Sequence, residues 1–182
     1  MLITPGYKDG NRYVHANQPM WGASAPRWRD DVLACIKDLK TDTILDYGCG
    51  KGHLKLALSK YGMTCAEYDP GIPGKDAMPE PADLVAALDV MEHVEPECLS
   101  AVLSHIGLLA RKGALLAIAL YPSGTVMPDG RNAHLIVEEP EWWLARITNT
   151  WRFPMELVSD VVPRPSRNPR KKDVLVVRMK VL

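Results

Sequence analysis

Asp46-Tyr47-Gly48-Cys49-Gly50-Lys51-Gly52 follows directly on the apolar run Thr43-Ile44-Leu45. In this segment an acidic residue is followed by three glycines, one at every second position. Glycines at that spacing permit a sharp turn in which the backbone comes close to a ligand. A carboxylate at the end of a strand can bind a cation or a polar group of the same ligand. The segment therefore predicts a strand, a tight turn and a helix that together hold a cofactor. A purely structural strand–turn–helix link is the alternative.

Two common nucleotide-binding patterns do not fit this segment. The dinucleotide pattern Gly-x-Gly-x-x-Gly needs glycine at position 53, where the chain has His53. The P-loop needs serine or threonine after its lysine, but Lys51 is followed by Gly52. The spacing therefore argues against a nicotinamide oxidoreductase and against a P-loop nucleotide hydrolase.

The composition indicates one folded domain over residues 1–182. The chain is 47% hydrophobic and its 182 residues are enough for one sizeable core. Its 22 basic and 22 acidic residues balance, so bulk charge indicates neither a nucleic-acid nor a membrane partner. No apolar run approaches the ~18 residues of a membrane span, and the N-terminus lacks the pattern of a secretion signal. We expect a cytoplasmic protein that is a monomer or a homodimer.

The cysteines give no sign of a metal centre or a disulfide framework. No C-x-x-C pair occurs, and the four thiols are widely spaced at Cys35, Cys49, Cys65 and Cys98. Free thiols in a reducing cytoplasm are the simpler interpretation. We accordingly expect no bound metal.

Apolar periodicity predicts strands that alternate with helices. Strands are expected at residues 43–47, 63–68, 82–88, 114–120, 151–157 and 174–180, the last two as a hairpin. Helices are expected from Ser24 to Leu39, at 52–61, at 96–110 and from Glu139 onward. Such alternation is typical of an α/β fold whose mainly parallel sheet is covered on both faces. Ligands of these sheets bind beyond the carboxyl ends of the strands, which is where the glycines fall.

Further polar segments follow the later strands. Asp69 lies 19 residues after Gly50 at the end of a strand, where a carboxylate can accept hydrogen bonds from both hydroxyls of a ribose. Glu67 is the alternative, and an aspartate that only forms the turn before Pro70 is also possible. The other segments are Lys75-Asp76-Ala77-Met78, Leu88-Asp89-Val90-Met91-Glu92-His93-Val94 and Arg111-Lys112-Gly113-Ala114-Leu115-Leu116.

In this order, over residues 44–120, the segments resemble the class I S-adenosylmethionine-dependent methyltransferases, in particular the small ubiquinone-biosynthesis-like group. The glycine segment resembles their motif I, and residues 82–94 resemble their "fDlV…DVxEHv" signature. The resemblance implies a Rossmann-like α/β fold with an antiparallel C-terminal edge and S-adenosylmethionine as cofactor, with S-adenosylhomocysteine as product. It implies cofactor contacts from Asp46, Gly48, Cys49, Gly50, Asp69, Pro70, Asp76, Ala77, Asp89 and Val90.

The resemblance also implies where on the cofactor these residues act. Asp69 matches the residue that holds the ribose, Asp76 and Ala77 match those beside the adenine, and the pair Asp89 and Val90 lies along the methionine part. The chain departs from the family between Asp69 and the strand at 82–88. Only about a dozen residues fill a gap that normally contains a helix and a strand. The adenine contacts are therefore the least firmly assigned, and a solvated loop aspartate is the alternative.

The methyl acceptor is expected to bind under residues 121–139, which follow a strand and so hang over the cofactor edge. This segment contains Arg131-Asn132-Ala133-His134 after the turn Pro128-Asp129-Gly130. His134 can act as a base because imidazole titrates near neutrality, and Arg131 and Asn132 can bind the substrate. His93 is the second catalytic candidate. For both histidines a purely packing role is the alternative.

We also expect an N-terminal arm, and a basic cluster lies near the C-terminus. Residues 1–40 are expected to form an arm or lid followed by the first helix. Near the C-terminus, Arg164, Arg167, Arg170, Lys171 and Lys172 form a basic cluster that can touch nucleic-acid phosphates but lacks interleaved aromatic residues. The chain has neither a Pro-Cys pair nor the Asn/Asp-Pro-Pro-Tyr/Phe motif typical of DNA methyltransferases. A small-molecule acceptor is therefore favoured, with methylation of RNA or another macromolecule, or a catalytically silent cofactor-binding module, as alternatives.

Overall fold

A computed structural model of the chain describes residues 1–151, 153–163 and 173–182. The basic cluster at Arg164, Arg167, Arg170, Lys171 and Lys172 lies outside the described residues. Within the described residues, no helix is long and apolar enough to cross a membrane.

Six strands form one mixed sheet in the order β2-β1-β3-β4-β6-β5. The first four strands pair in parallel, and β6 and β5 add an antiparallel edge. The strands are β1 Ile44–Tyr47, β2 Ala66–Tyr68, β3 Ala82–Leu88, β4 Ala110–Ala119, β5 Met155–Pro163 and β6 Asp173–Val181. This arrangement confirms the predicted α/β fold with an antiparallel C-terminal edge.

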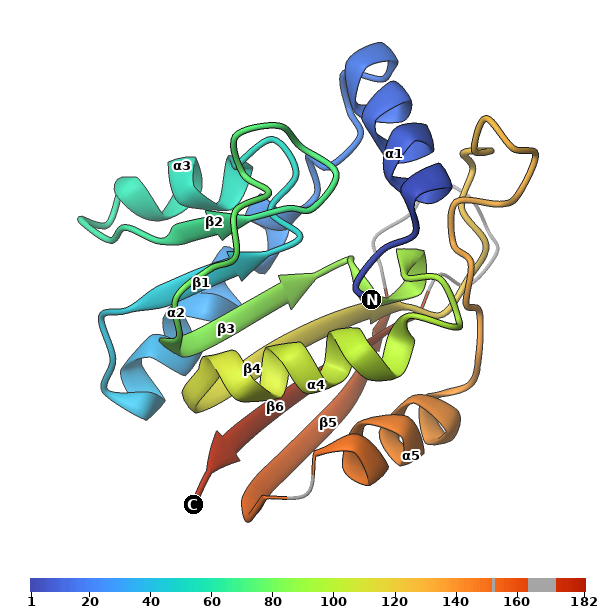
Figure 1. The fold of residues 1–182 in the computed structure, drawn as a ribbon. Coiled ribbons are helices and arrows are strands. Elements are labelled where there is room, and N and C mark those ends of the chain that lie inside the picture. Colours follow the sequence, from blue (N-terminus) through green and yellow to red (C-terminus); the bar gives the residue numbers. More distant parts are fainter. Residues whose placement is uncertain (152, 164–172) are drawn as a thin grey trace.

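Helices cover both faces of the sheet (Figure 1). The helical elements are α1 Pro5–Asn17, η1 Ala25–Trp28, α2 Arg29–Leu39, α3 His53–Ser59, η2 Met91–His93, α4 Leu99–Leu109 and α5 Pro140–Thr150. On one face α4 and α5 pack over the strands around the buried Trp143, and on the other face α2 and α3 pack around the buried Val32. The interior of β3 and β4 is almost continuously apolar, as a parallel sheet covered on both sides requires.

The short connection from Asp69 to β3 adds no strand beyond β2 to the sheet. Residues 69–81 contain neither a helix nor a strand, so β2 is the edge strand and is only three residues long. This outcome agrees with the brevity of the sequence there. The predicted strand at 63–68 was too long, because its first residues continue the turn after α3.

Other element boundaries also differ from the prediction. Strand β5 spans Met155–Pro163 rather than 151–157, because Trp151 packs into the core and caps α5 instead. Helix α4 begins at Leu99, three residues later than expected, and β4 begins at Ala110. These shifts do not change the order of the elements.

Helix α1 was not predicted as a helix. It begins after Thr4, whose side chain accepts a hydrogen bond from the Tyr7 amide, and it buries Tyr7 and Val14. These side chains pack against Met127 and Ala133 in the segment 121–139. In Figure 1, α1 and this segment stand together at the end of the sheet where the parallel strands terminate. The first part of the chain therefore covers the edge at which the glycine segment lies.

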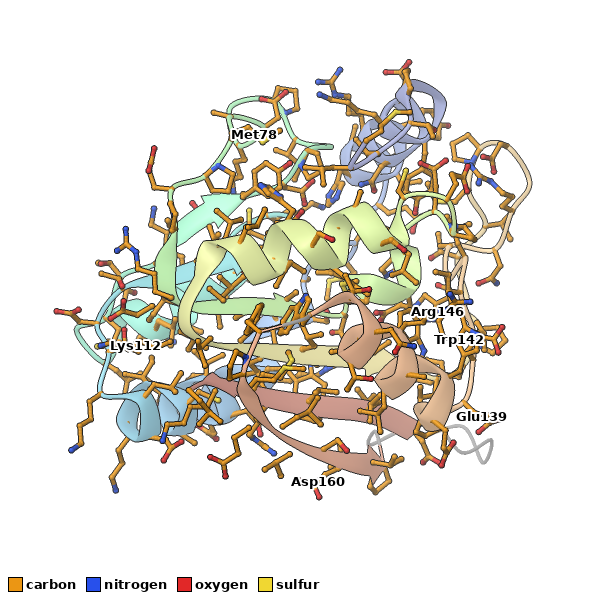
Figure 2. The ribbon with its side chains drawn as sticks, turned by 60° about the horizontal axis from the view of Figure 1, so that its bottom comes forward. Met78, Lys112, Glu139, Trp142, Arg146 and Asp160 are labelled. Carbon is orange, nitrogen blue, oxygen red and sulfur yellow. The ribbon has the colours of Figure 1, made fainter. Side chains whose placement is uncertain are left out.

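The aromatic pair at the start of α5 lies elsewhere. Trp143 is fully buried, whereas Trp142 is half-buried and carries the Arg146 guanidinium 4.8 Å from its ring centroid. Figure 2 shows Trp142 and Arg146 side by side on α5. Neither tryptophan lines the cavity described below.

Candidate active site

A cavity of about 270 Å³ lies at the carboxyl ends of β1 and β3. Its size is close to the lower end of the ~300–1,000 Å³ of typical ligand sites. Of the predicted site residues, eight line it: Gly48, Gly50, Asp69, Pro70, Asp89, Val90, His93 and His134. The parallel topology thus brings together residues that lie up to 86 positions apart in the chain.

The glycine turn is built as its spacing predicts. Gly48, Gly50 and Gly52 have φ angles of 74°, 51° and 79°, in the left-handed region that disfavours other residues. A Cβ on Gly48 would lie 2.5 Å from a methyl carbon of Val90. The turn therefore needs glycine both for its conformation and for the close approach of the Val90 side chain.

Asp69 stands at the end of β2 and faces the cavity. Its carboxylate accepts hydrogen bonds from the amides of Gly50, at 3.0 Å, and Gly71, at 2.8 Å. The alternative acid, Glu67, does not line the cavity and instead pairs with Lys55 and Lys75. The structure thus separates the two acids by position, and Asp69 is the one beside the glycine turn.

Asp46 lies below the cavity rather than in its wall. The side chain is 1% exposed, and its Oδ2 has no hydrogen-bond partner among the described residues. Burial, reinforced by the nearby Glu67 carboxylate, raises the pKa of Asp46 to about 7. Cys49 is also buried and does not line the cavity. Neither residue contributes to the cavity wall in this structure.

Asp89 holds the end of β3 in an unusual backbone conformation. Its φ is 56°, which is rare for a residue with a side chain and is found most often at functional sites. The carboxylate forms an ion pair with Arg27 and accepts a hydrogen bond from the Trp28 indole at 3.3 Å. Element η1 therefore fixes Asp89 at the cavity wall.

Asp76 and Ala77 are not among the residues that line the cavity. The Asp76 carboxylate lies on the outer side of α1, 3.3 Å from the Lys8 amine and 3.6 Å from the Arg12 guanidinium. In this structure it joins the loop 69–81 to α1. The short loop does not bring the aspartate to the cavity wall.

Arg131 and Asn132 likewise contact the protein rather than the cavity. Arg131 pairs with Asp129 and Glu95 and lies over the Tyr7 ring. The Asn132 side chain accepts a hydrogen bond from the Ser123 amide and donates one to the Ser123 carbonyl. Both side chains shape the segment 121–139 in this structure.

His93 and His134 meet edge to face in the cavity, with ring centroids 4.8 Å apart. His93 Nδ1 lies 2.7 Å from the Ala133 carbonyl oxygen, and His134 Nδ1 bonds the Tyr121 carbonyl oxygen. A carbonyl only accepts hydrogen bonds, so each Nδ1 is the donor. Burial, followed by the neighbouring His134, lowers the pKa of His93 to about 4, so its ring is neutral at neutral pH.

Glu92 is an acidic cavity residue to which the sequence analysis gave no role. It is completely buried beside the two histidines, and neither carboxylate oxygen has a hydrogen-bond partner among the described residues. Burial, with the Asp89 charge, raises its pKa well above the ordinary value. The available signal was its place in the run Asp89–Val94, from which the sequence analysis assigned roles to Asp89, Val90 and His93 but none to Glu92.

The N-terminal segment forms part of the cavity wall, through residues to which the sequence analysis gave no individual role. Asn11, His15 and Trp21 line the cavity, and the Trp21 indole donates a hydrogen bond to the Asn11 side chain at 3.2 Å. The Lys51 amine donates to the carbonyls of Gln18 and Pro19, each at 2.8 Å. The glycine segment therefore tethers the chain that covers it.

Comparisons with known proteins identify the family of the chain. Residues 20–159 match the sequence model of a family described as a methyltransferase domain. No curated protein sequence gives a significant match.

Two similar solved structures illustrate the shared fold. The 1,6-didemethyltoxoflavin-N1-methyltransferase of Burkholderia thailandensis, solved with 1,6-didemethyltoxoflavin and S-adenosylhomocysteine, is 20% identical and has a TM-score of 0.66. That match covers 100% of this chain and 92% of the other. The magnesium protoporphyrin IX methyltransferase of Synechocystis PCC 6803, solved with S-adenosylhomocysteine, is 17% identical over 84% of this chain and 82% of the other, with a TM-score of 0.57. The chain belongs to the methyltransferase-domain family and has the Rossmann-like fold of class I S-adenosylmethionine-dependent methyltransferases.

Proposed function

We propose that this chain transfers a methyl group from S-adenosylmethionine to an oxygen or nitrogen atom of a small molecule, as a single domain. The observation that carries the proposal is the cavity at the glycine turn, with Gly48, Gly50 and Asp69 in its wall. Family membership supports the reaction class. Both solved structures described above contain S-adenosylhomocysteine, which supports the cofactor.

The charge of the cavity fits a cationic cofactor. The wall contains four acidic side chains and, among the described residues, neither lysine nor arginine; the acids are Asp69, Asp89, Glu92 and Glu95. S-adenosylmethionine carries a sulfonium, an ammonium and a carboxylate group, whereas a dinucleotide would bring phosphates, and among the described residues the wall offers neither lysine nor arginine to pair with them. The electrostatics therefore favour the sulfonium cofactor over a nicotinamide cofactor.

The proposed cofactor contacts follow the positions of the residues. We propose that Asp69 accepts hydrogen bonds from the ribose hydroxyls, and that the backbone of Gly48 and Gly50 approaches the ligand closely because no side chain intervenes. Pro70, Asp89 and Val90 complete that wall. Asp46 and Cys49 support the turn from beneath, and we propose indirect roles for them. Asp76 and Ala77 remain proposed adenine neighbours that require α1 and the loop 69–81 to rearrange.

His93 and His134 are the proposed catalytic residues. The cofactor supplies an electrophilic methyl group, so the protein must mainly hold the acceptor atom in line with it at near-attack distance. Both rings lie in the wall of the same cavity as Asp69. Arg131 and Asn132 are proposed to bind the acceptor less directly, through the shape of the segment 121–139.

Enclosure of the cavity supports a small acceptor. Residues of α1, the segment after it and the segment 121–139 all contribute to the wall. Tyr7 and Val14 pack against that segment and join the two covers. We propose that the N-terminal part acts as a lid, which must open to admit a cofactor and an acceptor together, because the cavity is only about 270 Å³.

The experiment that tests the function is methyl transfer itself. The protein is incubated with S-adenosylmethionine and pools of small hydroxylated or amino compounds, and S-adenosylhomocysteine is quantified. We expect acceptor-dependent product, and His134→Gln should lower its rate while cofactor affinity is retained. His53→Gln is the matched control, because His53 does not line the cavity. Product only with RNA would assign the acceptor to the macromolecular class, and cofactor binding without product under any condition would identify a silent module.

A further inference from the structure

Three side chains in the cavity form a cluster of metal-ligand type. One donor atom from each of Glu92, His93 and His134 lies within 4.8 Å of the other two. The first two residues belong to η2 at the end of β3, and the third lies in the segment 121–139. The Ile136 amide donates a hydrogen bond to the Glu92 carbonyl at 3.1 Å, which holds the two segments together.

Glu92 lacks the partners that the other acids of the cavity have. Asp69 accepts two backbone hydrogen bonds, Asp89 pairs with Arg27, and Glu95 accepts from Thr4 and lies 3.7 Å from Arg131. Within the described part of the chain, both Glu92 oxygens are buried and form no hydrogen bond of normal geometry, although the nearby Glu92 and Ala119 amides offset part of the effect of burial on the pKa. Burial of an uncompensated carboxylate is costly unless a cation or a proton compensates it.

The histidines are oriented as metal-binding histidines usually are. Each Nδ1 donates its hydrogen bond to a backbone carbonyl, that of Ala133 for His93 and that of Tyr121 for His134. In a neutral imidazole this leaves the lone pair on Nε2. A backbone carbonyl behind the ring is a common device that fixes the tautomer and the orientation of a ligand histidine.

We propose that Glu92, His93 and His134 bind a divalent first-row transition metal ion such as zinc, manganese or cobalt. Two imidazoles and one carboxylate are ligands that such ions accept, and imidazole favours them over magnesium or calcium. Donor atoms about 2.0–2.2 Å from one ion can be at most ~4.4 Å apart, so small side-chain rotations must draw the cluster together. Three protein ligands leave coordination positions open.

The role of the ion rests on the proposed function and deepens it. An open position beside the cofactor cavity can hold an acceptor oxygen, and a metal ion lowers the pKa of a hydroxyl bound to it. The hydroxyl gives its proton to water when it binds. Its lone pair then forms the new oxygen–carbon bond while the sulfur–carbon bond of the donor breaks and that electron pair remains on sulfur. The acceptor is accordingly a hydroxyl compound, and the histidines act as ligands rather than as proton acceptors.

Metal binding is measured first, without any substrate. The full chain is freed of metal with a chelator, the chelator is removed, and Zn²⁺, Mn²⁺ and Co²⁺ are titrated by calorimetry, with the Co²⁺ visible spectrum as a second readout. We expect one bound ion per chain and a Co²⁺ spectrum characteristic of nitrogen and oxygen ligands. Glu92→Gln and His134→Gln should each weaken binding by at least about tenfold, and His53→Gln should bind as the wild type does.

Two controls keep the outcome decisive. Thermal unfolding and the far-ultraviolet circular dichroism spectrum of each variant show that it is folded, so a loss of metal binding is not a loss of structure. Absence of stoichiometric binding to the wild type, or equal affinity in Glu92→Gln, would overturn the metal site. Metal binding without methyl transfer would instead overturn the proposed function and leave the site standing. Methyl transfer by a protein that binds no ion would overturn the metal site and leave the proposed function standing.

Discussion

At the scale of single residues, the buried carboxylate of Asp46 couples stability to pH. Its pKa is about 7 in the folded chain, against an ordinary value of 3.8. Between these values the unfolded chain has released the proton and the folded chain still holds it. The free energy of unfolding therefore contains a contribution that is fully present below about pH 4 and is lost as the pH rises toward 7, worth at most about 4 kcal/mol.

Asp46→Asn removes this titration while the shape of the side chain is kept. Denaturant unfolding of the wild type and the variant from about pH 4 to about pH 8 measures the difference between their free energies of unfolding. We expect that difference, wild type minus variant, to fall with rising pH by up to about 1.4 kcal/mol per pH unit and to level off above pH 7. Parallel curves would show that Asp46 has an ordinary pKa.

Gly48 is the position at which a single methyl group should damage the site. Gly48→Ala strains a residue with φ of 74° and drives a Cβ to 2.5 Å from Val90. We expect a loss of about 1–3 kcal/mol in the free energy of unfolding and a large loss of S-adenosylmethionine affinity. Gly62→Ala is the matched control, because Gly62 has φ of 72° but no atom within 4 Å of an added Cβ. It should share the backbone strain and keep the affinity. Equal affinities in the two variants would contradict the role of the glycine turn.

At the scale of elements, α1 is held to the rest of the molecule by a small interface. Its buried side chains are Tyr7 and Val14, and its ion pairs from Lys8 and Arg12 to Asp76 are partly exposed. Exposed ion pairs contribute little to stability, so apolar burial holds the helix. A helix held in this way suits the proposed lid, which would have to open locally while the sheet stays folded.

Tyr7→Ala should loosen this lid. We expect faster amide hydrogen exchange in α1 and in the segment 121–139, faster cofactor dissociation, and little change in exchange of β3 and β4. Tyr13→Ala is the control on the same helix, because Tyr13 is 61% exposed. If exchange in α1 were the same in both variants, or if the core strands exchanged as fast as α1, the lid would not be an independent unit.

The elements also show why some of the fold was visible in the sequence. Strands β1 and β3 are apolar runs followed by a glycine or an aspartate, β4 contains a long apolar run, and α2 and α4 have regular apolar faces. Helix α1 was missed because it buries few side chains and contains Gly6 and Gly10, both unfavourable inside helices. Its stability comes from tertiary packing on Met127 and Ala133, which local pattern does not reveal.

At the scale of the whole molecule, the sheet topology assembles the cavity from segments distant in the chain. Asp69 and Asp89 could be predicted there because parallel strands end at one edge. Arg131, Asn132 and Asp76 contact other protein groups in this structure. The partners of loop side chains such as these depend on the tertiary structure and cannot be predicted from the local sequence. The contacts of α1 depend on three-dimensional neighbours and had no pattern of their own, and the run Asp89–Val94 did not reveal that Glu92 would be buried beside two histidines. The clustering of Glu92 with two histidines also departs from the expectation of no metal, which rested on the cysteines.

The central claim is that the glycine turn and Asp69 hold S-adenosylmethionine, and calorimetry tests it most directly. Titration of the wild type, Asp69→Asn and Glu67→Gln with S-adenosylmethionine, and of the wild type with NAD, compares the two acids and the two cofactors. We expect one S-adenosylmethionine per chain, no NAD binding, and unchanged affinity in Glu67→Gln. Asp69→Asn should bind at least about tenfold more weakly, because a hydrogen bond to a charged group is worth about 1.5–3 kcal/mol. Wild-type affinity in Asp69→Asn, or a preference for NAD, would contradict the assignment of the site.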